Sequence, residues 1–211
     1  MWAVIPVKKI DDAKCRLKSV LNSDQRKKLF VAMLEDVLST VMDISELDEV
    51  SLATICPIAS KIARKYDATI LSTLKDEGQT EAIKKAATII ENQGSKTILM
   101  LPADIPLATV SEIRTVIKIH ENSPMITIVP AKDNLGSNCI ALSPPTAMPL
   151  NFGQNSYFPH IEKARNLGIK IYSALLPGIS LDIDTPEDLK KLCQKPIRTH
   201  AQKYLFNQKI M

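Results

Sequence analysis

Short apolar runs alternate along the chain with segments in which apolar residues recur at helical spacing. The runs have the length of β-strands and lie at 2–7, 49–55, 68–72, 96–102, 125–130, 138–142 and 169–175. The helical segments lie at 23–41, 58–66, 79–91, 110–120 and 157–168, the first capped by Ser23. Strands that are apolar at nearly every position are typical of a sheet buried on both faces. The pattern predicts a single doubly wound α/β sheet, mostly parallel, with helices on both faces.

The length of the chain suits one domain. Its 211 residues are 45% hydrophobic, which is enough to bury a substantial core, and no internal repeat is present. Residues 1–195 carry the alternating pattern. Residues 196–211 are basic and weakly patterned, and we expect them to form a tail, a docking arm or a dimer contact.

The stretch LDIDTPEDL at residues 181–189 combines a helix start with an unusual density of acids. Thr185 is typical of a helix N-cap and is followed by proline at the first helical position. Glu187 and Asp188 then lie in the first turn, where the helix dipole stabilises negative charge. Asp188 is also spaced to complete a capping box with Thr185.

The two remaining acids of this stretch precede the cap. We expect the apolar run 179–183 to be extended like a strand, which points Asp182 and Asp184 to one side and Leu181 and Ile183 to the other. Two like charges so close together repel each other unless water or a cation separates them. The stretch alone leaves two interpretations open, a solvated edge strand or carboxylates that hold a cation.

Charge and cysteine usage exclude several classes. The 27 basic and 23 acidic residues are scattered, for a net charge of +4, so nucleic-acid binding is not indicated, whereas a small polyanion would suit this balance. The four cysteines form no CxxC pair and indicate neither zinc nor disulfides. No apolar segment approaches the ~20 residues that span a bilayer. We therefore expect a soluble, cytoplasmic protein.

Ligands of doubly wound sheets bind beyond the carboxyl ends of the strands, and polar residues follow three of the predicted strands. One of these places is a loop with five basic residues, Lys8, Lys9, Lys14, Arg16 and Lys18. The others are Asp104 and the pair Asp182 and Asp184. Together they suggest a divalent cation facing the phosphates of a nucleotide. Alternatively, the basic loop is an ordinary solvated surface and Asp104, between two prolines, is a turn residue.

Two glycine-containing loops offer further polar groups. Gly136, Ser137 and Asn138 enter a predicted strand, and Gly153 and Ser156 precede a predicted helix. Each loop is either a phosphate or carboxylate cradle or simply a loop. A histidine within the following helix, His160, is a candidate ligand or orienting group, although a structural role is the commoner one. No arrangement typical of covalent catalysis by serine or cysteine is evident.

An ordered set of motifs over about residues 2–193 resembles the CofC family of guanylyltransferases. The motifs are VIPVKKIDDAKCRL, LPADIPL, GSNCIAL, FGQNSYFPH and LDIDTPEDL. The resemblance implies a nucleotidyltransferase fold of the glycosyltransferase-A-like type. It also implies transfer of GMP from GTP to the phosphate of 2-phospholactate, phosphoenolpyruvate or 3-phosphoglycerate, with release of pyrophosphate, in coenzyme F-420 biosynthesis.

The resemblance also implies roles for individual residues. Those expected to bind the nucleotide are Lys8, Lys14, Arg16, Gly78 and Thr80, of which Lys14 and Arg16 would be catalytic together with Asp104. Those expected to bind Mg²⁺ are Asp104, Asp182 and Asp184, and those expected to bind the acceptor are Ser137, Gly153 and Ser156. The expected partners are GTP and a small phosphorylated acid, with a homodimer left open and with no nucleic acid or membrane.

The chain departs from the family pattern at several positions. The basic loop has Ile-Asp-Asp and Cys15 where the family usually has Gly and Thr or Ser, the usual GTN is GSN, and DEGQTEAI has Thr80 in place of Asn. Two alternatives therefore stay open. One is a related nucleotidyltransferase that acts on molybdopterin or a sugar acid, and the other is a nucleotide-binding regulatory module without turnover.

Overall fold

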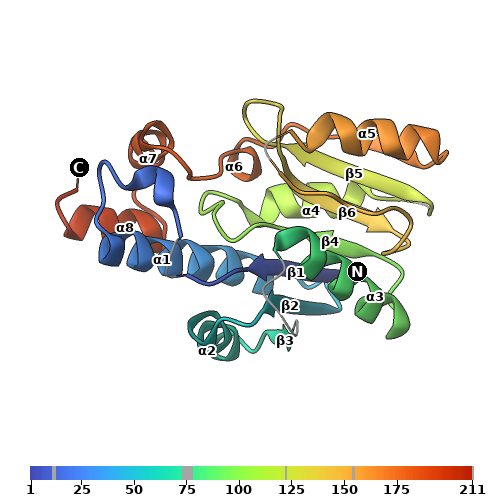
Figure 1. The fold of residues 1–211 in the computed structure, drawn as a ribbon, viewed down its shortest axis with the longest axis horizontal. Helices are drawn as coiled ribbons and strands as arrows, with labels where there is room; N and C mark the ends of the chain where they lie inside the picture. Colours follow the sequence, from blue (N-terminus) through green and yellow to red (C-terminus); the bar gives the residue numbers. More distant parts are fainter. Residues whose placement is uncertain (11–12, 73–77, 122, 154, 211) are drawn as a thin grey trace.

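The computed structural model describes residues 1–10, 13–72, 78–121, 123–153 and 155–210, and these contain one seven-stranded sheet (Figure 1). The strands are β1 (Trp2–Val7), β2 (Glu49–Thr54), β3 (Thr69–Leu71), β4 (Ile98–Met100), β5 (Met125–Pro130), β6 (Ser137–Ser143) and β7 (Lys170–Ser173). Their order is β3-β2-β1-β4-β6-β5-β7. Strand β6 runs antiparallel to β4 and β5, and the other pairs are parallel. The predicted mostly parallel sheet is confirmed.

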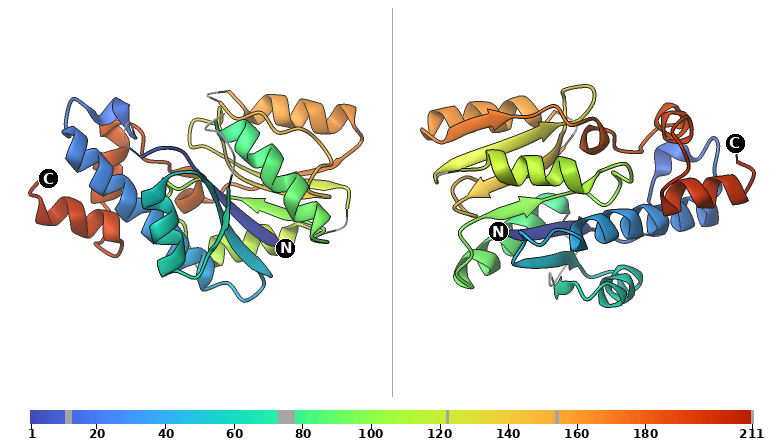
Figure 2. Two further views of the ribbon diagram at one scale, coloured as in Figure 1. Left: turned by 60° about the horizontal axis from the view of Figure 1, so that its bottom comes forward. Right: turned by 180° about the vertical axis from the view of Figure 1, so that it is seen from behind.

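Helices cover both faces of this sheet (Figure 2). The helices are α1 (Ser23–Met42), α2 (Pro57–Lys65), α3 (Gln79–Asn92), α4 (Val110–Ile119), α5 (Tyr157–Asn166), α6 (Pro177–Ser180), α7 (Pro186–Cys193) and α8 (His200–Asn207), with a 3-10 turn at Cys15–Leu17. Helices α1, α2 and α4 share a core with one face, and α3 and α5 share a core with the other. Alternation along β1 serves both cores, since Ala3 and Ile5 join the first and Val4 joins the second.

The carboxyl ends of the parallel strands meet at one edge of the sheet, where the loops that follow β1, β4 and β5 lie close together. Because β6 is antiparallel, its first residue lies at this same edge, and Ser137 pairs with Pro130 at the end of β5. The backbone N–H of Ile183 donates to the carbonyl of Asp104 at 3.0 Å. This bond brings the acidic stretch 181–184 beside the loop that follows β4.

The structure corrects the sequence interpretation at two points. The cap of α1 is Asn22 and not Ser23, and Asn22 forms a capping box with Gln25. Residues 179–183 do not form a strand, since they comprise the end of α6 and an extended segment outside the sheet. Alternation still holds in that segment, because Leu181 and Ile183 are buried in a third core between the start of α1, α7 and α8.

The C-terminal segment packs on the first helix of the same chain. Helix α8 lies along α1, with Ala201 and Leu205 fully buried (Figure 1). The Asp36 carboxylate on α1 accepts hydrogen bonds from the backbone N–H groups of His200 and Ala201, at 2.6 and 2.9 Å. An acid at a helix N-terminus is favourable, so this contact fixes α8 in place. The division of the chain at residue 195 stays a prediction.

Candidate active site

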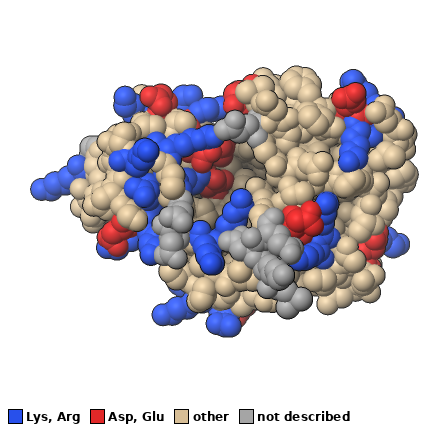
Figure 3. All heavy atoms as spheres, in the orientation of Figure 1, with Lys and Arg blue, Asp and Glu red and all other residues tan. Residues whose placement is uncertain are grey.

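Two cavities of similar size open at the carboxyl edge of the sheet. The first measures about 530 Å³ and lies between the loop after β1 and the start of α3. The second measures about 510 Å³ and lies between the β5–β6 loop, the start of α5 and the start of α7. Four residues line both cavities: Gln79, Pro102, Asp104 and Asp184. In Figure 3, acidic side chains are visible in a hollow that has lysine and arginine side chains around its rim.

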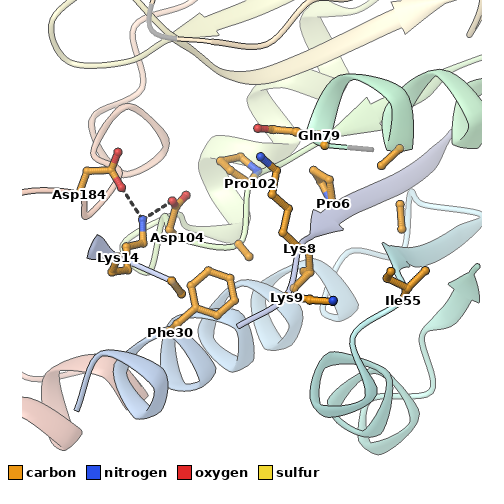
Figure 4. A pocket seen from close by; sticks show the side chains of 16 residues that line it. Pro6, Lys8, Lys9, Lys14, Phe30, Ile55, Gln79, Pro102, Asp104 and Asp184 are labelled. Carbon is orange, nitrogen blue, oxygen red and sulfur yellow. Dashed lines mark hydrogen bonds and ion pairs between the residues drawn. The ribbon is translucent and has the colours of Figure 1, made fainter. Parts of the chain in front are cut away.

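The first cavity combines cations with apolar walls. Lys8, Lys9 and Lys14 line it, and the side chain of Lys8 extends toward Pro102 and Gln79 (Figure 4). The predicted nucleotide-binding residue Gly78 lines it as well, just before α3. Gly78 has a φ of +91°, a conformation that side-chain-bearing residues rarely adopt. The cavity can therefore receive an anionic ligand that also has an apolar or aromatic portion.

Lys14 lies between two carboxylates at the junction of the cavities (Figure 4). Its Nζ forms an ion pair with Asp104, and a second with Asp184 at 2.7 Å. The Lys14 side chain is only 5% exposed. Burial by itself would lower the pKa of Lys14, but the two carboxylates outweigh it and raise the pKa. Lys14 is therefore a fixed cation that neutralises much of the acidic charge.

The acids at the junction have different environments. Burial would raise the pKa of Asp184, but Lys14 and Arg16 outweigh this effect and lower it. The pKa of Asp182 is raised, first because the carboxyl is buried and next because Asp104 is close. Asn138 donates from Nδ2 to Asp182 at 3.1 Å, which partly offsets this. The charge of Asp182 is thus only partly compensated.

The three predicted metal ligands lie near one another without forming a ready metal site. Among the described residues, no group of three or more His, Cys, Asp or Glu side chains is arranged to hold a metal ion. The donor chemistry nevertheless fits a hard cation, since the buried Oδ1 of Asp104 has no hydrogen-bond partner and the nearby Asp182 is poorly compensated. A cation bound here would require the carboxylates to close around it and Lys14 to give up at least one contact.

The second cavity contains a hydrogen-bonded cradle. Ser156 accepts from the backbone N–H of Ser137 at 3.1 Å and donates to the Ser137 hydroxyl at 3.3 Å. His160 is buried, and burial followed by the charge of Lys163 lowers its pKa to about 4, so its ring is neutral at pH 7. Its Nε2 accepts from the N–H of Asn151 at 3.1 Å, so its proton is on Nδ1, which donates to Ser137 at 3.0 Å. The Ser137 hydroxyl hydrogen is left to be donated to a ligand.

The predicted acceptor-binding residues are brought together, since Ser137, Gly153 and Ser156 all line this second cavity. Gly153 has open space where a side chain would begin, so the cradle stays accessible there. His160 lines neither cavity and bonds to Ser137, which fits the orienting role that the sequence left open and not the role of a direct ligand.

Two predicted nucleotide-binding residues lie elsewhere than expected. Arg16 lines the second cavity, where its Nη1 is 3.5 Å from Asp184. Thr80 lines neither cavity, and its hydroxyl accepts from the backbone N–H of Phe152 at 3.0 Å. Thr80 therefore supports the loop that carries Gly153. The unusual loop residues Asp11 and Asp12 and the first two residues of DEGQTEAI lie outside the described part of the chain.

The structure adds Gln79 and Lys132 to the predicted site residues and gives a partner to Asn138, which was already a candidate. Gln79 lines both cavities, Asn138 bonds to Asp182, and Lys132 lines the second cavity and pairs with Asp188. Asn138 stands next to Ser137 in the glycine-containing loop, and its polar group was visible in the sequence. Lys132 follows directly after β5, so the rule that ligands bind beyond strand ends was the signal that could have found it.

Comparison with known proteins gives a consistent result. A family model described as "Guanylyl transferase CofC like" matches residues 1–211. Phosphoenolpyruvate guanylyltransferase of Conexibacter woesei is 30% identical, over 90% of this chain and 86% of the relative. 2-phospho-L-lactate guanylyltransferase of Methanocaldococcus vulcanius is 31% identical, over 97% and 90%. 3-phospho-D-glycerate guanylyltransferase of Colwellia psychrerythraea is 33% identical, over 90% and 89%.

Solved structures agree in fold. A nucleotidyl transferase from Methanothermobacter superposes with a TM-score of 0.69 at 13% identity, covering 98% of each chain. At this identity the likeness concerns the fold alone. None of the described helices has both the length and the apolar character needed to cross a membrane.

Proposed function

The chain belongs to the family of CofC-like guanylyl transferases, and we propose that it transfers GMP from GTP to the phosphate of a small phosphorylated acid, with release of pyrophosphate. One observation supports this most strongly. Two cavities of similar size meet at Asp104 and Asp184, as a reaction between two separately bound phosphate compounds requires. Reactants held in adjoining sites meet without the entropic cost of a free encounter.

The first cavity is assigned to GTP in this proposal. Lys8 and Lys14 would neutralise the triphosphate, with Arg16 reaching it from the side of the second cavity. The apolar residues around Ile55 would contact the base. Lys14 would exchange a carboxylate partner for a phosphate oxygen, so its charge stays balanced throughout.

The chemistry is an in-line displacement at the α-phosphorus. An oxygen of the acceptor's phosphate forms the new bond to the α-phosphorus, and the bond from the α-phosphorus to the bridging oxygen of the β-phosphate breaks. The electron pair of that bond leaves with pyrophosphate. The attacking phosphate is already an anion near neutral pH, so no general base is needed. The protein's contribution is to position the two phosphates and to compensate their charge.

We further propose that Asp104, Asp182 and Asp184 hold a divalent cation, Mg²⁺ by preference. The partnerless Oδ1 of Asp104 and the weakly compensated Asp182 support this assignment. A bound Mg²⁺ would offset the negative charge of the two phosphates that must approach each other. Lys14 and Arg16 would then act beside it on the leaving pyrophosphate.

The acceptor is assigned to the cradle of the second cavity. The curated relatives act on phosphoenolpyruvate, 2-phospho-L-lactate and 3-phospho-D-glycerate, which all carry a phosphate and a carboxylate. Ser137, Gly153 and Ser156 would receive the acceptor, which fits the free hydrogen of Ser137. We propose coenzyme F-420 biosynthesis as the pathway of this reaction, and membership of the family supports this. A cytoplasmic location and a homodimer remain expectations from the sequence.

Phosphorus NMR with the purified chain tests the proposal. We expect GTP, Mg²⁺ and one of the three acids to give pyrophosphate and a new diphosphate diester, and we expect CTP and ATP to react more slowly. Excess EDTA should stop the reaction. A preference for CTP would favour a related nucleotidyltransferase, and GTP binding without turnover of any acid would favour a regulatory module. Either result would contradict the proposed function.

A further inference from the structure

Lys132 lies in the second cavity with its charged end held in place. It follows β5, and its ammonium forms an ion pair with Oδ1 of Asp188. Its backbone N–H donates to the carbonyl of Ser180 at 2.9 Å. Both ends of the lysine are thereby anchored to the segment 180–188. The Lys132 side chain remains 34% exposed, so a ligand in the cavity can reach it.

Asp188 does more than complete the cap of α7. Its Oδ2 accepts from the backbone N–H and the hydroxyl of Thr185, at 2.9 and 2.8 Å, and from the N–H of Asp184 at 3.3 Å. Its Oδ1 faces Lys132. With a side chain only 3% exposed, Asp188 connects the start of α7, the backbone of Asp184 and Lys132. A buried carboxylate that is fixed through the hydrogen bonds to its Oδ2 gives the paired lysine a defined position.

Lys132 is the cation of the second cavity that the proposed reaction at the junction does not use. Among the described residues that line this cavity, Arg16 and Lys132 are cationic, whereas Asp104, Asp133, Asp182, Asp184 and Asp188 are acidic. Arg16 contacts Asp184 at the junction, where phosphate chemistry is proposed. Lys132 lines the second cavity and not the first, so it is set apart from the nucleotide. Burial, followed by the charge of Lys191, lowers the pKa of Lys132, so a further anion nearby would stabilise its ammonium.

We propose that Lys132, held by Asp188, is a specificity-determining residue that receives the carboxylate of the acceptor. This inference rests on the proposed function. Transfer uses the acceptor's phosphate, which must lie at the junction near Asp104 and Asp184. The second anionic group of the acid then needs its own cation, and Lys132 supplies it beside the cradle of Ser137 and Ser156. Lys132 thereby selects phosphorylated acids over phosphorylated alcohols.

The test compares an acid with an analogue that lacks the carboxylate. Isopropyl phosphate is 2-phospholactate with a methyl group in place of the carboxylate, so the pair isolates that group. Wild-type protein and the variants Lys132→Met and Lys132→Arg are assayed for kcat/KM with both acceptors. Calorimetry measures the binding of both compounds without GTP. Lys170→Met serves as the control, because this exposed lysine on β7 lines neither cavity.

We expect wild-type protein and Lys170→Met to prefer the acid strongly. In Lys132→Met the preference should fall about tenfold to 100-fold, mainly through the acceptor KM and with the KM for GTP unchanged, as expected for the loss of a charged hydrogen bond. Lys132→Arg should retain most of the preference. Thermal melts establish that each variant is folded.

An unchanged ratio of acid to analogue in folded Lys132→Met, whatever the fall in turnover, would overturn the proposal and make Lys132 a support for α7 only. A ratio that falls as far in folded Lys132→Arg as in Lys132→Met would also contradict it, because the arginine keeps the positive charge. The calorimetric ratio decides this independently of catalysis. Wild-type protein that binds the acids but transfers no guanylyl group to them would instead contradict the proposed function.

Discussion

The two cavities differ in how their polar groups are held. In the second, Ser137, Ser156 and His160 are bonded to one another, and the cradle is complete before any ligand arrives. In the first, the cationic groups are lysines of one loop, and Lys14 is paired with two carboxylates that a bound phosphate would have to replace in part. The difference suggests a preorganised acceptor site, which sets specificity, beside a nucleotide site that rearranges on binding.

The largest effect is expected at the junction, which both cavities share. Asp184→Asn keeps the shape of the side chain but removes its charge, so turnover should fall about 10³-fold if a cation is held there. Stopped assays of pyrophosphate release measure it. Asp24→Asn, on the exposed start of α1, is the matched control and should behave as wild type. An active Asp184→Asn protein would remove the metal assignment.

Stability gives Asp184 a second signature. Because the pKa of Asp184 is lowered in the folded chain, its contribution to stability is present above its unfolded value near 4 and disappears as pH falls through the folded pKa. The side chain is 38% exposed, so the contribution at pH 7 should be about 1 kcal/mol or less. Denaturant melts of Asp184→Asn and wild type should therefore converge at low pH.

Lys14→Met should slow turnover by about 10² to 10³, because one fixed cation is lost from the leaving group. It should also destabilise the chain at pH 7, since Asp104 and Asp184 lose their neutralising partner. The pKa of Lys14 is raised, so its stabilisation is complete below the unfolded value near 10.4 and is lost only as pH rises through the folded pKa. Lys18→Met, on the same loop, is the control. An unchanged rate would mean that the basic loop is an ordinary solvated surface.

Ser156→Ala tests the cradle of the second cavity. The variant removes the hydroxyl oxygen that accepts the hydrogen bond from the Ser137 N–H. The KM for the phosphorylated acid should therefore rise about tenfold, while the KM for GTP changes little. Steady-state kinetics with each substrate varied in turn measures both constants, and Ser111→Ala on α4 is the control. If the KM for GTP rises and the acceptor KM holds, the two cavities have been assigned to the wrong substrates.

Asp188→Asn should mainly cost stability. The amide can keep part of the cap but loses the charge that pairs with Lys132, so we expect a loss of about 2 kcal/mol by denaturant unfolding. The kcat/KM for the phosphorylated acid should fall only a few-fold, through a higher KM. A collapse of kcat with normal stability would place Asp188 in the chemistry itself.

The smallest effect is expected at Thr80, which the motif comparison assigned to the nucleotide. Its hydroxyl bonds to the N–H of Phe152, so Thr80→Val should raise the acceptor KM about threefold and leave the KM for GTP unchanged. Fluorescence titration with a labelled GTP analogue gives the nucleotide affinity directly. A large loss of that affinity would mean that Thr80 binds the nucleotide after all.

Local patterns in the sequence were sufficient to predict most elements. The cap at Thr185 and the acid at Asp188 specify the start of α7 through contacts within one turn. Apolar runs located the seven described strands; β1, β2, β4, β5 and β6 are buried at nearly every position, whereas β3 and β7, at the two ends of the sheet, are partly or mostly exposed. Residues 179–183 were assigned wrongly as strand-like, since a short apolar run fits a strand and a buried turn of helix equally well. Helix α8 was not predicted because only Ala201, Gln202 and Leu205 are buried on it.

The parts of the candidate site that the sequence did not predict depend on the directions of individual side chains. Asp104, Asp182 and Asp184 were expected to share a site because strand ends converge. Only Asp104 follows a strand of the sheet, and the hydrogen bond from the N–H of Ile183 to the carbonyl of Asp104 brings the other two beside it. The position of Lys14 between two of them depends on a loop conformation, with Lys14 at a φ of 58°, that no periodicity encodes. Gly78 lines the first cavity, but the hydroxyl of Thr80, two residues later, bonds to Phe152 in a loop of the second cavity. Lys132 is a single lysine shortly after β5, so only the rule that ligands bind beyond strand ends points to it.

A structure with an unreactive GTP analogue and 2-phospholactate both bound would show whether the two cavities are the two substrate sites. We expect the nucleotide in the first cavity, the acid against Ser137 and Ser156 in the second, and the α-phosphate and the acid's phosphate facing each other beside Asp104 and Asp184. Finding both compounds in one cavity, or their phosphates away from this junction, would contradict this assignment.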